Sequence, residues 1–186
     1  MARVRWAWIA AGVVGAVLLY GILTFNRLVA LRNRVRNGWS QIDVQLRRRY
    51  DLIPNLVETV RGYAAHEREL FEKVAEARAR AIEAQGVRPQ ADAEDGITRG
   101  LRRLLAVAEA YPELRASEQF LALQEELTAT ESKIAYARQF YNDQVMRLNT
   151  LVGSFPSSLV ARLFGFRPEE FFDIEDPVRG PVAVDL

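Results

Sequence analysis

Apolar side chains recur every three or four residues along most of the chain beyond its amino-terminal region, the spacing of one face of an α-helix. The pattern predicts helices over about residues 26–49, 56–82, 97–108 and 120–151, with a polar loop over 83–96. No long stretch alternates apolar and polar residues, so no β-sheet is predicted. Helices with one apolar stripe and short connections are typical of an all-α, antiparallel up-and-down bundle of about four helices.

The last of these helices has the most regular pattern, because its apolar positions fall seven residues apart. A strict heptad repeat indicates left-handed, coiled-coil-like packing. Together with one residue from each of the first two helices, this stripe is predicted to form the bundle core, which comprises Leu46, Leu56, Phe120, Leu127, Ile134, Tyr141 and Leu148.

Residues 1–25 are predicted to be a membrane anchor. Residues 6–25 carry no charge, and as a helix of about 20 residues they would span roughly 30 Å, the thickness of a bilayer's hydrocarbon core. The alternative is a cleaved signal peptide, but the apolar run is too long for one and no A-x-A site follows it. We therefore expect a single-pass membrane protein whose helical bundle covers residues 26–153.

The charges that flank the anchor indicate its orientation. Two arginines precede the apolar run, whereas a larger group follows it closely, and lysine and arginine near the ends of a span favour the cytoplasmic side. The bundle is therefore predicted to lie on the cytoplasmic side of the inner membrane. The arginines that follow the run are Arg27, Arg32, Arg34 and Arg36.

Small residues within the anchor lie four positions apart, a spacing that lets two membrane helices approach closely. The alternative is the ordinary composition of an apolar helix, and the sequence leaves both interpretations open. The candidate transmembrane packing residues are Ala7, Ala11, Gly12, Gly15 and Ala16.

The stretch QLRRRYDLIPNLVETV (residues 45–60) places a proline inside an otherwise helical pattern, shortly after three arginines. Pro54 lacks an amide donor and clashes with the carbonyl four residues earlier, that of Tyr50, and Asp51 is a favoured N-cap type. We predict a sharp corner at Asp51–Pro54, with a kinked single helix as the second interpretation. A basic binding patch is the third interpretation. It is the least favoured because adjacent helical residues diverge by about 100°, so three consecutive arginines cannot share one narrow face.

Residues 154–172 contain many aromatic and aliphatic side chains for a segment beyond the predicted bundle. A four-pass bundle would return this segment to the membrane side. Such a surface is expected to be covered by the bundle end, by a partner or second copy, or by lipid, in that order of preference. Residues 173–186 are predicted to be a flexible tail. The candidate interaction residues are Phe155, Leu159, Leu163, Phe164, Phe166, Phe171 and Phe172.

Composition excludes several classes of function. The chain has 25 Lys and Arg against 24 Asp and Glu, a balance that argues against nucleic-acid binding by bulk charge. It has no cysteine and one histidine, and the stretch HEREL (66–70) lacks the second histidine of a zinc-protease motif. Phosphate-binding and nucleophile motifs are also missing from the sequence. We therefore expect no catalytic residues, metal, cofactor or small-molecule substrate.

The chain resembles the LemA family of bacterial membrane proteins in three separated blocks: VRNGWSQIDVQLRRRYDLIPNLVETVRGYAAHE (35–67), ARQFYNDQVMRLNTLVGSFP (137–156) and LFGFRPEEFF (163–172). The resemblance implies one amino-terminal anchor, an antiparallel bundle of about four helices and no established catalytic activity. Members are linked to membrane-associated or envelope processes, sometimes beside membrane metalloproteases. Gly38 and Leu148 depart from the residues expected, and Gly38 costs about 1 kcal/mol of helix propensity unless it permits a close helix crossing.

These observations favour a non-enzymatic, membrane-anchored scaffold that binds protein partners or assembles with itself. The first alternative is a protein that binds or remodels the lipid surface directly. The second is an enzyme whose site is not recognisable from sequence motifs.

Overall fold

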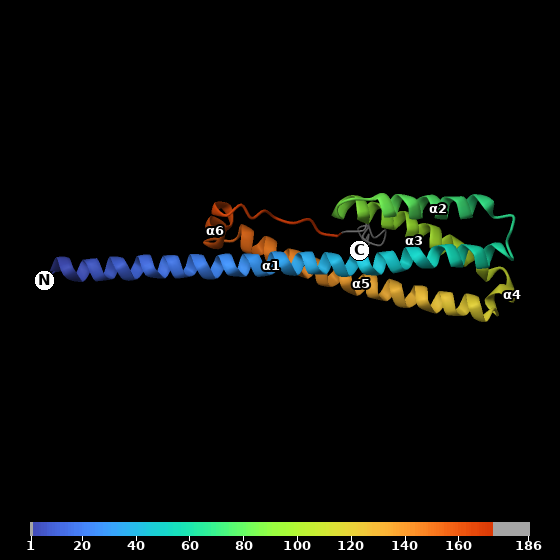
Figure 1. The fold of residues 1–186 in the computed structure, drawn as a ribbon, viewed down its shortest axis with the longest axis horizontal. Helices are drawn as coiled ribbons and strands as arrows, with labels where there is room; N and C mark the ends of the chain where they lie inside the picture. Colours follow the sequence, from blue (N-terminus) through green and yellow to red (C-terminus); the bar gives the residue numbers. More distant parts are fainter. Residues whose placement is uncertain (1, 173–186) are drawn as a thin grey trace, which may run out of the picture. The chain divides into compact units, whose positions relative to one another are not determined.

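The computed structural model describes the backbone of residues 2–172 and the side chains of residue 6 and of residues 8–172, so the predicted tail at 173–186 lies outside the described residues. Every regular element within the described residues is a helix, which confirms the predicted all-α class (Figure 1). The helices are α1 (Ala2–Arg61), α2 (Arg68–Glu83), α3 (Val87–Glu109), α4 (Pro112–Arg115), α5 (Glu118–Gly153) and α6 (Ser157–Leu163).

The chain forms two compact units, and α1 and α5 contribute to both. The first unit combines the chain up to Ser40 with Gln139–Glu170, and therefore contains α6. The second unit combines Gln41–Arg138 with the chain from Phe171, and contains α2, α3 and α4. All seven predicted core residues are buried.

The predicted corner at Asp51 and Pro54 is wrong, because α1 includes both residues and continues to Arg61. Both side chains are exposed, whereas Leu52, Ile53 and Leu56 around them are buried. Burial of these three residues offsets a helix-interior proline, whose cost is about 3 kcal/mol. The chain leaves the helix later, where the Ala64 amide bonds the Val60 carbonyl at 2.9 Å.

A side chain from α2 completes the hydrogen bonding at the proline. An α-helical residue donates its amide to the carbonyl four positions earlier, and Pro54 cannot donate to the Tyr50 carbonyl. The Arg78 Nε donates to this carbonyl instead, at 2.7 Å. The contact lies within the second unit and joins α2 to α1 at the position where α1 lacks its own donor.

Replacing Arg78 with alanine is expected to lower the free energy of unfolding by about 1.5–3 kcal/mol, because the Tyr50 carbonyl loses a charged donor. In a Pro54→Ala background the new amide can reach that carbonyl, so the same change should cost less. Chemical denaturation of the four proteins gives the coupling, and Arg80→Ala, an exposed change on the same helix, is the control. Equal costs of the Arg78 change in both backgrounds would contradict this assignment.

The predicted loop at 83–96 is also wrong over most of its length, because α3 begins at Val87. Gly86 has φ 95°, a left-handed conformation that favours glycine, and Pro89 lies in the first turn, where no amide donor is needed. Gln90 and Glu94 are buried on the same face as Ile97. Polar residues occupy the first part of the buried stripe, and so the apolar pattern does not show where the helix begins.

Gly38 permits a close approach of α1 and α5 within the first unit. A Cβ at this position would lie 3.2 Å from the Tyr141 Cα, a main-chain atom that cannot move aside easily. The Trp39 and Tyr141 rings lie beside this contact, with centroids 5.8 Å apart. The departure from alanine at residue 38 thus accompanies a tight helix crossing.

Candidate functional site

The three consecutive arginines do not form one binding face. Arg47 pairs with Asp43 on its own helix at 3.1 Å, and Arg48 pairs with Glu126 of α5 at 2.8 Å. Arg49 is only 2% exposed and points into the second unit. Each guanidinium therefore has a different environment, as the rotation of about 100° per residue requires.

Arg49 belongs to a buried polar network that the sequence analysis did not predict. Its Nη1 lies 3.3 Å from Glu94 Oε2, and its Nε lies 3.1 Å from Glu131 Oε1. Its Nη2 donates to the Thr98 hydroxyl at 2.9 Å. The Tyr50 hydroxyl donates to Glu94, which is 1% exposed. The one available signal was the position of Glu94, three residues before Ile97 on the apolar stripe of α3.

The electrostatics of this network indicate a structural role. Burial raises the pKa of Glu94, while the Tyr50 hydroxyl, Arg49 and Gln90 act in the opposite direction. Burial also raises the pKa of Tyr50, and the neighbouring Glu94 adds to the effect. Because Arg49 and Glu94 are both buried and paired with each other, the network joins α1 to α3 within the second unit.

The carboxyl-terminal aromatic residues fall into two groups. Phe166 and Phe172 are buried, in the first and second units respectively, and the Arg138 guanidinium lies 5.1 Å from the centre of the Phe172 ring. Phe155 and Leu163 are 81% and 78% exposed. Exposed residues of the candidate segment also include Leu159, Phe164 and Phe171. The segment is therefore partly packed on the protein and partly open.

The first unit places this segment beside the end of the uncharged run of α1. The Phe164 ring lies 4.7 Å from the Phe25 ring, and the Phe166 ring lies 6.0 Å from it, between centroids. The Arg32 guanidinium lies 4.9 Å from the centre of the Phe166 ring. The segment thus returns to the end of the uncharged run, although the chain reverses after α1 at 62–67 rather than at Pro54, and its position beside a membrane stays a prediction.

Hydrogen bonds fix the extended chain that follows α6 onto α5. The Tyr141 hydroxyl donates to the Glu170 carbonyl at 2.8 Å. Asn149 donates to the Glu169 carbonyl at 2.9 Å and accepts from the Glu169 amide at 2.8 Å. Burial, with the nearby carboxylates of Glu169 and Glu170, raises the pKa of Tyr141 to about 12, so the hydroxyl stays protonated and able to donate at physiological pH.

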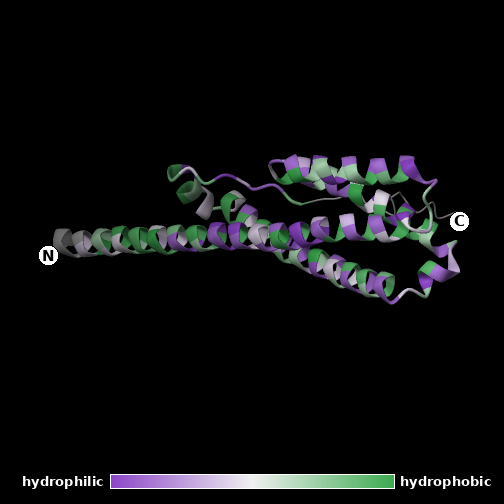
Figure 2. Ribbon diagram, turned by 45° about the vertical axis from the view of Figure 1, so that its right-hand side comes forward, coloured by the Kyte–Doolittle hydropathy of each residue, from purple (hydrophilic) through white to green (hydrophobic). Residues whose placement is uncertain are grey.

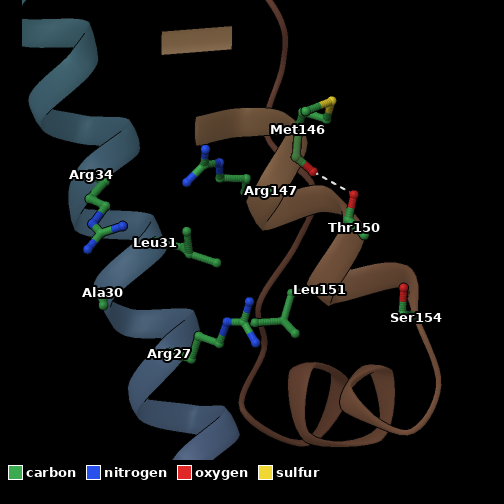
Figure 3. A pocket seen from close by; sticks show the side chains of 9 residues that line it. All are labelled: Arg27, Ala30, Leu31, Arg34, Met146, Arg147, Thr150, Leu151 and Ser154. Carbon is green, nitrogen blue, oxygen red and sulfur yellow. Dashed lines mark hydrogen bonds between the residues drawn. The ribbon is translucent and has the colours of Figure 1, made fainter. Parts of the chain in front are cut away.

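A groove lies between α1 and α5 in the first unit, with a volume of about 440 Å³. Arg27 and Arg34 stand two turns apart on α1 and share a face. Figure 3 shows Arg27 reaching toward α5 and Arg147 reaching toward α1. The lining residues are Arg27, Ala30, Leu31, Arg34, Met146, Arg147, Thr150, Leu151 and Ser154. This groove was not predicted, because it requires knowledge of which faces of α1 and α5 meet.

The amino-terminal part of α1 is long and apolar enough to cross a membrane, by length and composition. Figure 2 shows that apolar residues predominate along this part of the helix. Ala11, Gly12, Gly15 and Ala16 are exposed, and a Cβ at either glycine would meet no atom within 4 Å among the described residues. Of Ala7, the structure describes only its place in α1. The other four candidate packing residues are thus open to a neighbour.

The chemistry of the described residues does not suggest a metal centre, since no group of three or more His, Cys, Asp or Glu residues among them could hold an ion. His66, from the incomplete protease motif, lies 3.3 Å from the Tyr111 hydroxyl through its Nε2.

Comparison with known proteins places the chain in a family. Magnetosome proteins MamQ 1 and MamQ 2 of Paramagnetospirillum magneticum (strain AMB-1) are each 24% identical to it. Magnetosome protein MamQ of Magnetospirillum gryphiswaldense (strain MSR-1) is 23% identical. These matches cover 81% of the chain but only 65% of each relative's length. Membrane association is supported by the apolar amino-terminal part of α1 and by the match of residues 38–186 to the LemA family. The chain belongs to the LemA family.

Proposed function

We propose that this protein is a non-enzymatic, membrane-anchored scaffold that binds protein partners or further copies of itself. Residues 1–25 anchor it in the inner membrane, residues 26–153 form the bundle on the cytoplasmic side, and residues 154–172 form an interaction segment. One observation carries the proposal, namely that α1 is a single helix from its uncharged run into both compact units. Such a helix ties the bundle directly to the bilayer without a flexible linker.

The use of charge in the described residues supports a scaffold over an enzyme. Arg48 and Arg49 form ion pairs that join elements of the second unit, and the most deeply buried carboxylate, Glu94, has Arg49 and Tyr50 as partners. Groups of this kind stabilise helix packing, whereas a catalytic acid or base must reach a substrate. The arginines that follow the anchor support the cytoplasmic placement of the bundle.

Self-association through the anchor is tested with single cysteines, since the chain has none of its own. Gly15→Cys is expected to form disulfide-linked dimers in native membranes under mild oxidation, because residues 11 and 15 share a small-residue face. Val17→Cys, on a different face of the helix, is the control and should crosslink several-fold less. Mass spectrometry of larger crosslinked products would identify other partners. Equal crosslinking at both positions, or only monomer with no reproducible partner, would contradict the scaffold.

A second candidate function is direct binding to the lipid surface, and the open part of the carboxyl-terminal segment favours it. Phe155, Leu159 and Leu163 are exposed, and Phe164 lies against Phe25 at the end of the uncharged run. Aromatic and aliphatic side chains at that depth would enter the interfacial region of the bilayer.

A fluorophore on Leu163→Cys in the full chain is expected to be quenched strongly by lipids that carry a quencher near the headgroup. It should be quenched less by lipids with a quencher deep in the acyl chain. The control is Asn37→Cys, an exposed site about 18 Å beyond Phe25 by helical rise, which should show little quenching. Absence of quenching at residue 163 at every depth would exclude the lipid-surface function.

A further inference from the structure

The arginine-lined groove of the first unit has charge that no described residue neutralises with an ion pair. Arg27, Arg34 and Arg147 are exposed, and within the described part of the chain none of them forms an ion pair or a hydrogen bond. The lining residues include no carboxylate. A groove lined by charge of one sign focuses the electric field and raises the local concentration of counter-ions, so three guanidinium groups with no carboxylate among the lining residues favour an external anion.

The local sequence strengthens this argument. Residues 26–40 contain Arg27, Arg32, Arg34 and Arg36 and no Asp or Glu, although the whole chain has a formal net charge of only +1. On α5, Asp143 stands one turn before Arg147, but the two form no ion pair among the described residues. Arg32 differs from the groove arginines, because its guanidinium lies over the Phe166 ring.

The position of the groove along α1 indicates which anion it meets. Arg27 is the first charged residue after Arg5. By helical rise, Arg27 lies about 3 Å beyond Phe25 and Arg34 lies about 14 Å beyond Phe25. The headgroup layer of each leaflet is about 5–8 Å thick. Side chains of a helix lean toward its amino terminus, so Arg34 leans back toward this layer.

We propose that the groove binds the phosphate of an anionic phospholipid from the leaflet on the bundle side. The planar guanidinium group of arginine can donate two parallel hydrogen bonds to the oxygens of a phosphate. Arg27 and Arg147 reach across the groove from opposite helices (Figure 3). Leu31 and Leu151 line the same groove and limit water around the contact. A zwitterionic choline headgroup would bring its own cation among the three guanidinium groups, so the groove favours lipids with net negative charge.

Two hydroxyl groups lie at the α5 side of the groove. The Thr150 hydroxyl donates to the Met146 carbonyl at 2.8 Å, so its proton is already used. The Ser154 side chain has no partner among the described residues and can donate to a phosphate oxygen. Phe155, the next residue, is exposed and can pack on the acyl chains of the same lipid. The inference rests on the proposed membrane anchor but not on the scaffold role.

The test uses the full chain in detergent micelles, titrated with phosphatidylglycerol or with phosphatidylcholine and followed by native mass spectrometry. Wild-type protein is expected to bind phosphatidylglycerol at least about tenfold more tightly than phosphatidylcholine. One hydrogen bond to a charged group accounts for an affinity ratio of this size. The variant R27Q/R34Q/R147Q should lose this preference. The matched control R36Q/R102Q/R103Q removes the same charge from exposed arginines outside the groove and should keep it.

The other outcomes overturn the inference in distinguishable ways. Equal loss in both triple variants would mean that bulk charge, not the groove, selects the lipid. Displacement of the lipid by inorganic phosphate alone at similar concentration would mean that the occupant is a free phosphate. Alkaline carbonate extraction of the wild-type chain from membranes is the parallel measurement. Release of the chain would refute the anchor and the groove together, whereas retention without lipid preference would refute only the groove.

Discussion

Replacing Glu94 with alanine is expected to lower the free energy of unfolding by about 3–5 kcal/mol, the range found when one partner of a buried ion pair is removed. The Arg49 guanidinium would keep only Glu131 as a charged partner, and the Tyr50 hydroxyl would lose its acceptor. Chemical denaturation of the full chain in detergent, followed by circular dichroism, measures the change.

Two comparisons make this prediction specific. Asp95→Ala removes the neighbouring carboxylate, which pairs with Arg99 near the surface, and should cost no more than about 1 kcal/mol. The double change Arg49→Met with Glu94→Leu should recover much of the loss, because apolar residues of similar size often replace a buried ion pair without penalty. A Glu94→Ala protein as stable as Asp95→Ala would show that the network contributes nothing.

Leu127→Ala is the second large effect, with an expected loss of about 2–5 kcal/mol, because the side chain is 5% exposed and its removal leaves a cavity. The matched control is Leu121→Ala on the same helix, where the side chain is 50% exposed and the loss should stay below about 0.5 kcal/mol. The same denaturation experiment compares both. A similar loss at the two positions would mean that the heptad stripe of α5 is not the core-facing surface in solution.

The sequence alone was enough to predict those parts of the fold that the spacing of apolar residues determines. The heptad of α5 identified buried residues from Phe120 to Leu148, because a seven-residue repeat permits one core-facing stripe. The all-α class followed from the same periodicity. The return of the aromatic segment to the end of the uncharged run was predicted by counting passes, and the contact between Phe164 and Phe25 agrees with it.

The sequence was insufficient where a distant residue alters a local preference. A proline in the interior of a helix usually ends it, and so the local sequence around Pro54 predicted a helix end. Arg78 of α2 supplies the hydrogen-bond donor that Pro54 lacks, and no local pattern shows this. Gln90 and Glu94 were assigned to a loop because they are polar. Both are buried, with Gln90 hydrogen-bonded to Tyr50 and Glu94 paired with Arg49. The groove brings together Arg27 and Arg147, which are far apart in the chain and become neighbours only when α1 and α5 pack.

The division of the chain into two units has a consequence for the order of folding. Contacts of the first unit, such as Gly38 with Tyr141, close a loop of about 100 residues, and the entropy of such a closure opposes early formation. Residues 41–138 form most of the second unit, and once folded they shorten that loop. We therefore expect residues 41–138 to fold first during synthesis, with the close helix crossing and the arginine groove completed only after Ser154 has emerged. Ribosome-bound chains that stop before that point would have residues 41–138 folded and an unfinished groove.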